Sequence, residues 1–511
     1  MKISVIDLGF NSVKLVNYNV GSDNSFKREE QFSVKARLGE GLNKDRLLNE
    51  QAIIRALVAL KKFREVINLR MIRIILPIAT SAVREASNQH EFLRSVQKET
   101  GFRFKVLTEE EEALYSYIGA SRAIWLPEAL FFDLGGGSLE MVSTKDYKVK
   151  KIISLPLGAL RLSERFVSKT NGVLSKKDAL SLKSEIYDSL PSSSYLKISN
   201  DGIPLVGIGG SVRAIARFHQ KITKYPLPKI HNYVMDSFSL QSIRKDLCKL
   251  GYNKIANIDA IGKKRAHSIT AASFVIDTLM QKLGIEKLIV STHGLREGYL
   301  SEYLRNPLNI NSHRLDIKNI CNYNENQRNS WNLQNKTSDC IHLLLNFNII
   351  TPDEYQIFVC AKRMLTESYF AHAHTNVLFE LIMNETYPML SQEGQLMLAL
   401  SLISRRNPKS AEKLYSTYST IFVHYTKKSM QRVALCMDLS EIFEMYKVRV
   451  QLIPSEPPKF ILKIIPGKYH FPKLTILNKI KALEKATDIV LGYLISSKND
   501  DNNRKKLVLS P

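Results

Sequence analysis

The sequence has few cysteines and no long apolar run. Its five cysteines are scattered, odd in number and without the close spacing of metal ligands, so we assign them no role. No segment approaches the roughly 18 uncharged apolar residues of a membrane span, and the short apolar run at the start of the chain is interrupted at Asp7. These absences predict a soluble, cytoplasmic protein that does not bind membranes.

Negative charge is also scarce. The chain has 73 Lys and Arg against 49 Asp and Glu, a formal net charge of +24. A field of this sign concentrates polyanions such as nucleic acid or inorganic polyphosphate. No zinc-finger, ribonucleoprotein or basic-zipper signature occurs, so we expect no specific nucleic-acid partner. A basic surface that only keeps the protein in solution would explain the charge equally well.

One stretch has the pattern of a strand, a tight turn and a second strand. In Phe131–Val142, an apolar run leads into three successive glycines and another apolar run follows. Glycines carry no Cβ, so the backbone N–H groups of such a turn can approach an anion, and we expect a phosphate. Asp133 and Glu140 would then lie beside that phosphate, where carboxylates usually hold Mg²⁺. The alternative is an ordinary glycine-rich hairpin.

The same pattern occurs at the start of the chain. Asp7–Val16 aligns with Asp133–Val142 without a gap, and Asp, Leu, Gly, Ser and the final Val are identical. Two such hairpins, each opening its own stretch of chain, predict two related lobes whose turns face each other across a cleft. Phosphates would then be bound from both sides.

Strand and helix patterns alternate through the first 300 residues, which predicts an α/β fold. In the first lobe we expect strands at 32–42, 71–78 and 103–107, and helices at 51–69, 80–99 and 108–124. In the second lobe, a third glycine turn at Val206–Arg213 precedes a helix at 212–218, and a helix at 264–280 precedes a strand at 288–290. With 511 residues, the chain is long enough for two or three domains.

The ordered series of motifs resembles the exopolyphosphatase / guanosine pentaphosphate phosphohydrolase family, of the actin-like and sugar-kinase-like superfamily. The motifs are Asp7–Ser12, Arg37–Leu42, Ala79–Glu85, Glu111–Ala113, Asp133–Glu140, Leu155–Leu162, Gly207–Arg213 and Gly294–Gly298. This resemblance implies two ribonuclease-H-like lobes flanking a cleft, at 1–124 and 125–305. It also implies release of terminal orthophosphate from inorganic polyphosphate by Mg²⁺-assisted water attack, commonly by a homodimer.

The resemblance implies roles for individual residues. Glu112 falls on the family's catalytic glutamate, which would orient a water, and Arg84 falls on a phosphate-facing arginine. Asp133 and Glu140 fall on two further essential acids, which would hold Mg²⁺. From its local sequence alone, Glu112 is more typical of a solvated acid at a helix start. The phosphate-binding residues we expect are Asp7, Gly9, Asn11, Ser12, Gly135, Gly136, Gly137, Ser138, Gly209, Gly210 and Ser211.

The chain departs from the family pattern at three positions. Phe10 stands where serine is usual, Glu109 where glycine is usual, and His267 where a small or acidic residue is usual. Because Phe10 removes a phosphate-facing hydroxyl, a catalytically weak polyphosphate-binding sensor or scaffold is one alternative. Hydrolysis of guanosine pentaphosphate is another, because both substrates end in the same phosphoanhydride.

Residues 306–511 predict a separate, mostly α-helical domain. Longer family members end in a domain resembling metal-dependent His-Asp phosphohydrolases, but no His-Asp doublet follows Arg305, so this copy would be degenerate. His372, His374 and Asp438 lie in the corresponding region, and we expect ordinary surface residues rather than a di-metal site. Basic residues at intervals, among them Arg405 and Lys427, predict a path for the polyphosphate tail.

Overall fold

The chain forms two compact units, Met1–Asn324 and Glu325–Pro511. The computed structural model describes residues 1–42, 46–167, 171–199, 202–307, 339–346, 348–365, 373–454, 459–465, 472–487 and 489–495. In the described residues, no helix is both long and apolar enough to cross a membrane.

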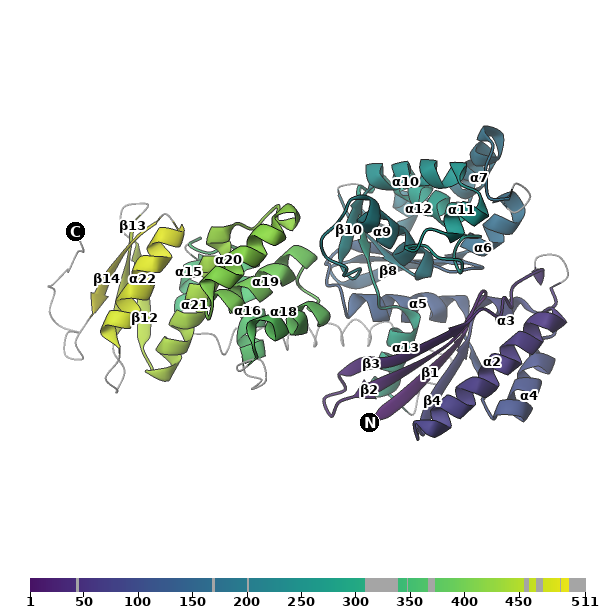
Figure 1. Ribbon diagram of the computed structural model, residues 1–511, viewed down its shortest axis with the longest axis horizontal. Coiled ribbons are helices and arrows are strands. Elements are labelled where there is room, and N and C mark those ends of the chain that lie inside the picture. Colours follow the sequence, from purple (N-terminus) through teal and green to yellow (C-terminus); the bar gives the residue numbers. More distant parts are fainter. Residues whose placement is uncertain are drawn as a thin grey trace. The chain divides into compact units, whose positions relative to one another are not determined.

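The first lobe contains a five-stranded sheet of order β3-β2-β1-β4-β5 (Figure 1). Its strands are β1 (Lys2–Leu8), β2 (Val13–Val20), β3 (Phe26–Val34), β4 (Ile74–Ala79) and β5 (Lys105–Val106). The first three are antiparallel, and β4 and β5 run parallel to β1. The helices are α2 (Glu50–Leu69), α3 (Ser81–Glu85), α4 (Gln89–Thr100) and α5 (Glu109–Ser121).

The second lobe contains a six-stranded sheet of order β10-β11-β9-β6-β7-β8. Its strands are β6 (Ala129–Leu134), β7 (Leu139–Lys145), β8 (Lys148–Leu155), β9 (Leu205–Ile208), β10 (Tyr233–Asp236) and β11 (Lys287–Val290). Its helices are α6 (Ala159–Leu162), the π-helix η1 (Ser163–Val167), α7 (Lys176–Ser189), α8 (Ser193–Leu196), α9 (Gly210–Ile222), α10 (Ser237–Lys249), α11 (Tyr252–Ala256), α12 (Ile269–Leu283) and α13 (Leu295–Arg305).

The two sheets have the same topology. Without β10, the order β8-β7-β6-β9-β11 repeats β3-β2-β1-β4-β5, with an antiparallel hairpin pair followed by two parallel strands. A helix follows each of the equivalent strands β4 and β9, and another follows each of β5 and β11. The predicted fold class of two related α/β lobes is therefore confirmed.

Helices α5 and α13 cross between the two sheets (Figure 1). A Cβ added to Gly298 would lie 1.8 Å from the carbonyl oxygen of Tyr115, and one added to Gly119 would lie 2.0 Å from that of Gly294. The helices therefore approach as closely as glycine permits. Helix α5 also packs on β6, β7 and β8, while α13 contacts β1, so the two lobes share one buried core.

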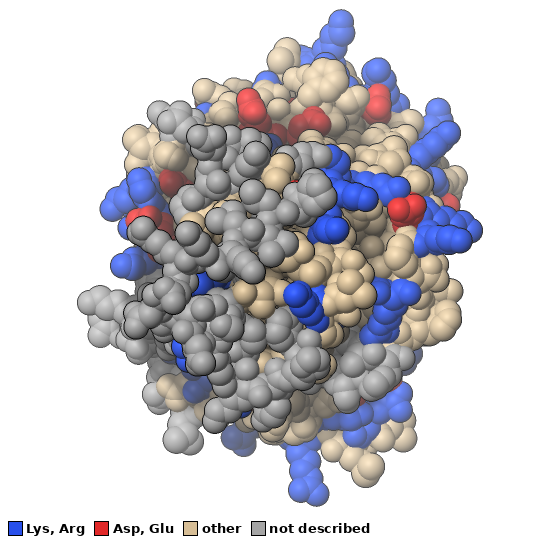
Figure 2. All heavy atoms as spheres, turned by 90° about the vertical axis from the view of Figure 1, so that its left-hand side faces the viewer, with Lys and Arg blue, Asp and Glu red and all other residues tan. Residues whose placement is uncertain are grey.

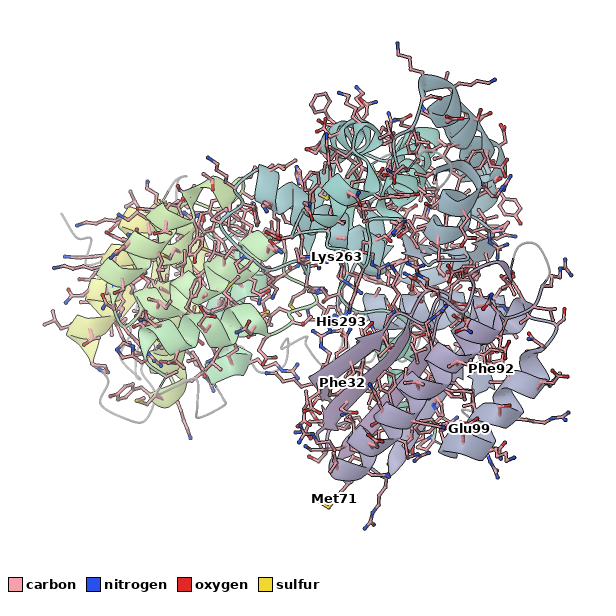
Figure 3. All side chains as sticks on the ribbon, turned by 45° about the vertical axis from the view of Figure 1, so that its right-hand side comes forward. Phe32, Met71, Phe92, Glu99, Lys263 and His293 are labelled. Carbon is pink, nitrogen blue, oxygen red and sulfur yellow. The ribbon has the colours of Figure 1, made fainter. Side chains whose placement is uncertain are left out.

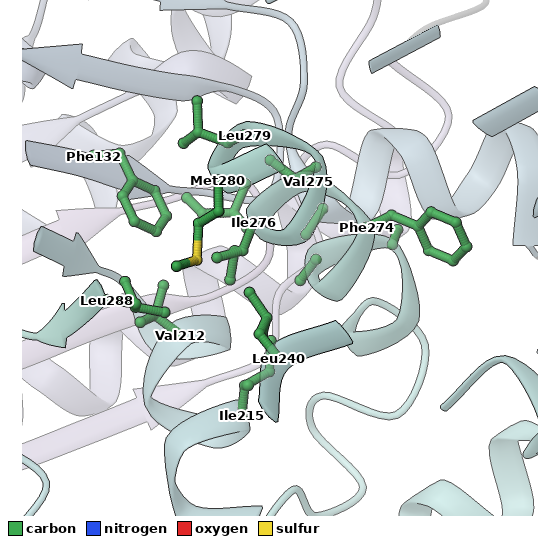
Figure 4. Packing of buried hydrophobic residues seen from close by; sticks show 14 of the residues in the cluster. Phe132, Val212, Ile215, Leu240, Phe274, Val275, Ile276, Leu279, Met280 and Leu288 are labelled. Atoms are coloured by element: carbon green, nitrogen blue, oxygen red, sulfur yellow. The ribbon is translucent and has the colours of Figure 1, made fainter. Parts of the chain in front are cut away.

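A second core lies within the second lobe. Met280 on α12 points toward Phe132 and Leu288 on the sheet (Figure 4). A Cβ on Gly207 would lie 2.8 Å from Val212 and 3.0 Å from Phe132, so this strand position leaves room for its neighbours. By contrast Met71, just beyond α2, is 86% exposed and points away from the first lobe (Figure 3).

Two expected elements of the first lobe are wrong. The strand predicted at 32–42 ends at Val34, because the chain then turns and donates from the Arg37 and Gly39 N–H groups to carbonyls of the first hairpin turn. The helix predicted at 80–99 is two helices, α3 and α4. The helical conformation is interrupted between them, because the Asn88 side chain forms two hydrogen bonds with the backbone of Leu48.

The C-terminal unit is mostly helical, as predicted. Its described helices are α15 (Asp339–Asn346), α16 (Pro352–Leu365), α18 (Thr375–Asn384), α19 (Gln392–Ser404), α20 (Pro408–Thr417), the 3-10 helix η4 (Ser419–Ile421), α21 (Lys427–Met445) and α22 (Lys473–Thr487). A three-stranded sheet of β12 (Arg449–Pro454), β13 (Lys459–Ile465) and β14 (Val490–Ile495) was not predicted.

Three of the charged residues noted in this unit, Arg405, Lys427 and Asp438, form ion pairs within it. Asp438 accepts from Arg405 at 2.7 Å and also pairs with Lys479, and His374 precedes α18 as its N-cap residue; His372 lies outside the described residues. Lys427 pairs with an acid on α20. Figure 2 shows Lys and Arg side chains scattered over the described part of one face of the molecule. The polyphosphate path stays a prediction.

Candidate active site

A cavity of about 810 Å³, including the part open to solvent, lies where the two hairpin turns meet. Most of the predicted site residues line it: Asp7, Gly9, Asn11, Ser12, Glu112, Asp133, Gly135, Gly136, Ser138, Glu140, Gly209 and Gly210. Arg84, Gly137 and Ser211 are not in the lining and lie beside lining residues. The structure thus brings together segments that are more than 200 positions apart in the sequence.

The two hairpin turns close in the same way. The Gly9 N–H donates to the Ser12 carbonyl at 3.1 Å, and the Gly135 N–H donates to the Ser138 carbonyl at 3.0 Å. These two N–H groups already form hydrogen bonds within the turns and cannot also bind an anion. The N–H groups of Gly136 and Gly137 donate to no backbone carbonyl in the described part of the chain, which leaves them for an anion.

Phe10 occupies the space between the two turns. It is 3% exposed, and its ring lies 2.2 Å from a Cβ position on Gly39, 2.5 Å from one on Gly137 and 3.2 Å from one on Gly136. These glycines, from two separate segments, make room for one aromatic ring. The absence of Cβ atoms in the second turn therefore serves Phe10 as well as a prospective phosphate.

Asp133 and Glu140 form a pair of carboxylates across the second hairpin. They are register partners on β6 and β7, and Asp133 accepts a hydrogen bond from Ser116 at 2.7 Å. Burial raises the pKa of both carboxyls. For Glu140, burial is the largest cause and the charges of Glu112 and Asp133 add to it, so that its pKa lies well above the usual value. A cation between them would relieve this repulsion.

The carboxylate pair fits Mg²⁺. In the described residues, no group of three or more His, Cys, Asp and Glu forms a protein cage for a metal. Mg²⁺ does not need one, because it is usually bound by one or two carboxylates and completes its octahedral shell with water and substrate phosphate oxygens. Asp133 and Glu140 are the residues that would hold it.

Glu112 lies on the first turn of α5, where a capping box fixes the helix start. Thr108 accepts from the Glu111 N–H at 3.1 Å, and Glu111 accepts from the Thr108 N–H at 2.9 Å. This places Glu112 toward the cavity, where it is 9% exposed rather than solvated. Burial raises its pKa to about 7, although Arg84 opposes the shift.

Arg84 holds Glu112 in place. Its Nη1 donates to Glu112 Oε2 at 2.9 Å and to the Leu107 carbonyl at 2.7 Å. The arginine is therefore in direct contact with the glutamate in this structure. Its predicted role of facing phosphate is not tested by these contacts.

Cationic side chains complete the cavity, and the sequence analysis did not single them out. They are Lys14, Arg213, Arg265 and Arg296. A Cβ on Gly210 would lie 1.8 Å from Arg265 Nη2, so the third glycine turn makes room for this arginine. Nη1 of the buried Arg296 has no hydrogen-bond partner in the described residues. An anion in the cavity would supply one.

Glu297 is an acid of the lining whose hydrogen-bond partners come from both lobes. It accepts from the Tyr18 hydroxyl at 2.6 Å and from the Gly294 N–H at 3.0 Å. Burial favours its neutral form, but Arg296 and His293 outweigh that effect and lower the pKa of its carboxyl. Figure 3 labels His293 near the start of α13. Glu297 therefore links β2 of one lobe to α13 of the other.

The model of the Ppx/GppA phosphatase family matches residues 26–306, which is more than half of the chain. The chain belongs to the Ppx/GppA phosphatase family. The two α/β lobes and the cavity between them lie within or next to the matched residues, so the family assignment and the site concern the same part of the molecule.

Individual relatives are distant. The chain is 28% identical over 315 residues to the bifunctional 3-dehydroquinate synthase/phosphatase of Fusobacterium nucleatum, which is 59% of this chain and 46% of that protein. It thus spans about half the length of this relative. It is 24% identical to the exopolyphosphatase 1 of Mycobacterium leprae, over 59% of this chain and 88% of that protein.

A solved structure shows the same fold. The crystal structure of an exopolyphosphatase from Cytophaga hutchinsonii matches 61% of this chain and all of its own length, with a TM-score of 0.56 and 22% identity. At this identity, the likeness shows the fold alone.

Proposed function

We propose that the protein is an exopolyphosphatase that releases terminal orthophosphate from inorganic polyphosphate. The observation that carries this proposal is one cavity lined by both cationic and acidic side chains. The cations are Lys14, Arg213, Arg265 and Arg296, and the acids include Glu112, Asp133 and Glu140. Phosphoryl transfer needs binding and charge neutralisation of the phosphate together with a positioned water. The cavity offers residues for both.

The cationic side chains would bind the terminal phosphate and hold it in line with the attacking water. Arg296 is suited to this because it is buried and has an unpartnered guanidinium nitrogen. Glu112 would orient the water and accept its proton, because its pKa of about 7 is near the optimum for a general base at neutral pH. Arg84 keeps the Glu112 carboxylate in one orientation through the 2.9 Å hydrogen bond.

Mg²⁺, when bound by Asp133 and Glu140, would neutralise charge on the phosphate oxygens. The cofactor is part of the proposal, and it is supported by the register pairing of the two acids and by their raised pKa values. The homodimer and the cytoplasmic location implied by the resemblance stay predictions.

Hydrolysis of guanosine pentaphosphate is the second candidate. The same four cations and Glu112 suit any terminal phosphoanhydride, and the cavity does not distinguish an inorganic chain from a nucleotide. Phosphate release from long-chain polyphosphate and from guanosine pentaphosphate, compared as kcat/KM with Mg²⁺ present, decides between them. We expect the higher value for polyphosphate, and a clear preference for the nucleotide would overturn the first proposal.

Phe10 favours a third candidate, a polyphosphate-binding sensor or scaffold, because its ring fills space beside the second glycine turn. The same assay tests it. Protein that binds polyphosphate with Mg²⁺ and never releases phosphate would be a binding module rather than an enzyme.

A further inference from the structure

Ser116 lies next to the carboxylate pair but outside the lining of the active-site cavity. It is a buried residue of α5, 2% exposed, and its hydroxyl donates to Asp133 Oδ2 at 2.7 Å. Asp133 lines the cavity, whereas Ser116 does not. Any effect of Ser116 on the reaction therefore passes through the Asp133 carboxylate.

The Ser116 hydroxyl points away from its own helix. A serine within a helix often donates to the backbone carbonyl four residues earlier. Ser189, Ser301 and Ser416 do so on α7, α13 and α20. Ser116 donates instead to a side chain on β6, so its hydroxyl is directed at the Asp133 carboxylate and not at the helix backbone.

The Asp133 carboxylate depends on this one donor. In the described part of the chain, Ser116 is the residue that donates a hydrogen bond to it. The other oxygen, Oδ1, lies beside the third glycine turn, 3.0 Å from a Cβ position on Gly209. Carboxylates that bind a metal are held in orientation by hydrogen bonds from outer residues. The Ser116 hydrogen bond holds Oδ2 and leaves Oδ1 for a cation.

Glu140, the second acid of the pair, has two donors. Ser154, its register partner on β8, donates to Oε1 at 3.3 Å, and Ser138 also forms a hydrogen bond with the carboxylate. Loss of one of these serines leaves Glu140 held by the other. The orientation of the carboxylate pair is therefore more sensitive to Ser116 than to Ser154 or Ser138.

Ser116 also connects Asp133 to the proposed general base. Glu112 precedes Ser116 by four residues on α5, the helix that runs between the two sheets (Figure 1). Residues four apart lie on the same face of a helix. The hydrogen bond therefore ties a carboxylate on the sheet of the second lobe to the helix face that carries Glu112.

We propose that Ser116 is a positioning residue that fixes the Asp133 carboxylate in the orientation that binds Mg²⁺. The proposal rests on the proposed function, because it concerns the cation of the same site. Without the hydroxyl, the carboxylate can rotate about its Cβ–Cγ bond, and binding of the cation must then order it.

The test measures metal binding rather than turnover. Mn²⁺ is used as a paramagnetic probe in place of Mg²⁺, and its dissociation constant is measured by electron paramagnetic resonance on the full-length protein. Orthophosphate is present, because phosphate oxygens complete the shell of the cation. The variants are Ser116→Ala, Ser116→Cys, Ser116→Thr and Ser154→Ala. Thermal unfolding checks that each variant folds.

Ser273→Ala is the matched control. Ser273 is a fully buried serine of α12, and its hydroxyl also donates at 2.7 Å, but to the carbonyl of Thr270 in its own helix. This variant removes a buried hydroxyl and a hydrogen bond of the same length without touching the carboxylate pair. A general effect of losing a buried hydroxyl would therefore be seen in both alanine variants.

We expect Ser116→Ala to weaken Mn²⁺ binding by about tenfold or more, as when an outer donor to a metal ligand is lost. Ser116→Thr keeps the hydroxyl and should recover most of the affinity, and Ser116→Cys, a weaker donor, should lie between them. Ser154→Ala should lose less, and Ser273→Ala should bind as the parent does. Unchanged affinity in Ser116→Ala, or equal losses in Ser116→Ala and Ser273→Ala, would overturn the proposal.

Phosphate release distinguishes this proposal from the proposed function. If the wild type releases no phosphate but Ser116→Ala still binds Mn²⁺ more weakly, the positioning role stands and the enzyme assignment fails. If the wild type releases phosphate and Ser116→Ala keeps its Mn²⁺ affinity, the enzyme assignment stands and the positioning role fails. In an active enzyme, the Mg²⁺ concentration for half-maximal turnover should rise in Ser116→Ala by the same factor as the Mn²⁺ dissociation constant.

Discussion

In the first hairpin Asp7 lies opposite Lys14, and in the second hairpin the equivalent positions hold Asp133 and Glu140. The first pair is an ion pair, with Lys14 Nζ 3.5 Å from Asp7 Oδ2. The second pair is two carboxylates of raised pKa. The two hairpins have the same topology, but Lys14 of the first is replaced by Glu140 in the second. The first pair is therefore neutral overall, whereas the second pair carries only acidic groups.

This comparison shows how a duplicated fold can produce an asymmetric site. The first pair neutralises itself, whereas the second requires a proton or a cation. Anionic phosphate should therefore associate with the cationic side chains and Mg²⁺ with the second hairpin. The following predictions test this division, beginning with the largest expected effect.

Glu140→Lys would give the second hairpin the Asp–Lys pair of the first. We expect phosphate release to fall by about 10³-fold or more, because a bound metal stabilises the transition state by several kcal/mol. The new lysine can pair with Asp133, as Lys14 pairs with Asp7, so the thermal midpoint should change little. Turnover and unfolding are measured at saturating Mg²⁺.

Glu140→Gln is the matched control, since it removes the charge without supplying a cation. It should also lose turnover and show a weaker response to Mg²⁺. Normal activity in either variant would contradict the division of roles between the hairpins.

Glu112→Gln tests the acid that belongs to neither hairpin. The amide keeps the shape but cannot accept a proton, so kcat should fall by about 10²-fold or more. Binding of polyphosphate should persist, because the four cations of the cavity are untouched. Near-normal turnover would remove Glu112 from the mechanism.

Gly298→Ala tests the close crossing that joins the two lobes. The added Cβ would lie 1.8 Å from the Tyr115 carbonyl oxygen, so we expect a loss of about 1–3 kcal/mol in the free energy of unfolding. Gly394→Ala on α19 is the control, because the nearest described neighbour of its Cβ, the Tyr425 hydroxyl, would lie 3.4 Å away. Equal stability of the two variants by denaturant unfolding would mean that the crossing relaxes without cost.

The smallest expected effect concerns the pKa of Glu112 in metal-free protein. A nearby negative charge disfavours ionisation, so both Asp133 and Asp7 raise the pKa of Glu112, which lies at about 7. Asp133→Asn should lower it more than Asp7→Asn, because Asp133 has the larger influence. Arg84→Met should raise it. Carboxyl NMR titration measures all three, and equal shifts for the two aspartates would contradict the asymmetry.

The duplicated architecture was predictable because it depends on local signals. The gapless alignment of the two hairpins and the alternation of strands and helices are both visible in the sequence. The two elements that were predicted wrongly lie where contacts between distant residues determine the backbone conformation. Asn88 breaks the predicted helix by bonding to Leu48, and the Gly39 N–H ends the predicted strand by donating to the first turn.

The acids of the site were predictable in the same way, but its cations were not. Asp133 and Glu140 flank a glycine turn, a pattern with a chemical meaning. Arg265 has no such pattern, since it lies in a run of basic residues and reaches the site only because Gly210 leaves room for it. Lys14 had a usable signal, because it stands at the position of Glu140 in the alignment.

The ring of Phe10 makes four positions dependent on one another, which restricts the order in which the sequence can change. While position 10 carries an aromatic ring, the Cβ of an alanine at position 39, 136 or 137 would lie 2.2–3.2 Å from that ring. Those substitutions become accessible only after position 10 has become small. With serine at position 10, larger residues at positions 39 and 136 would become possible, and once present they would block a return to phenylalanine.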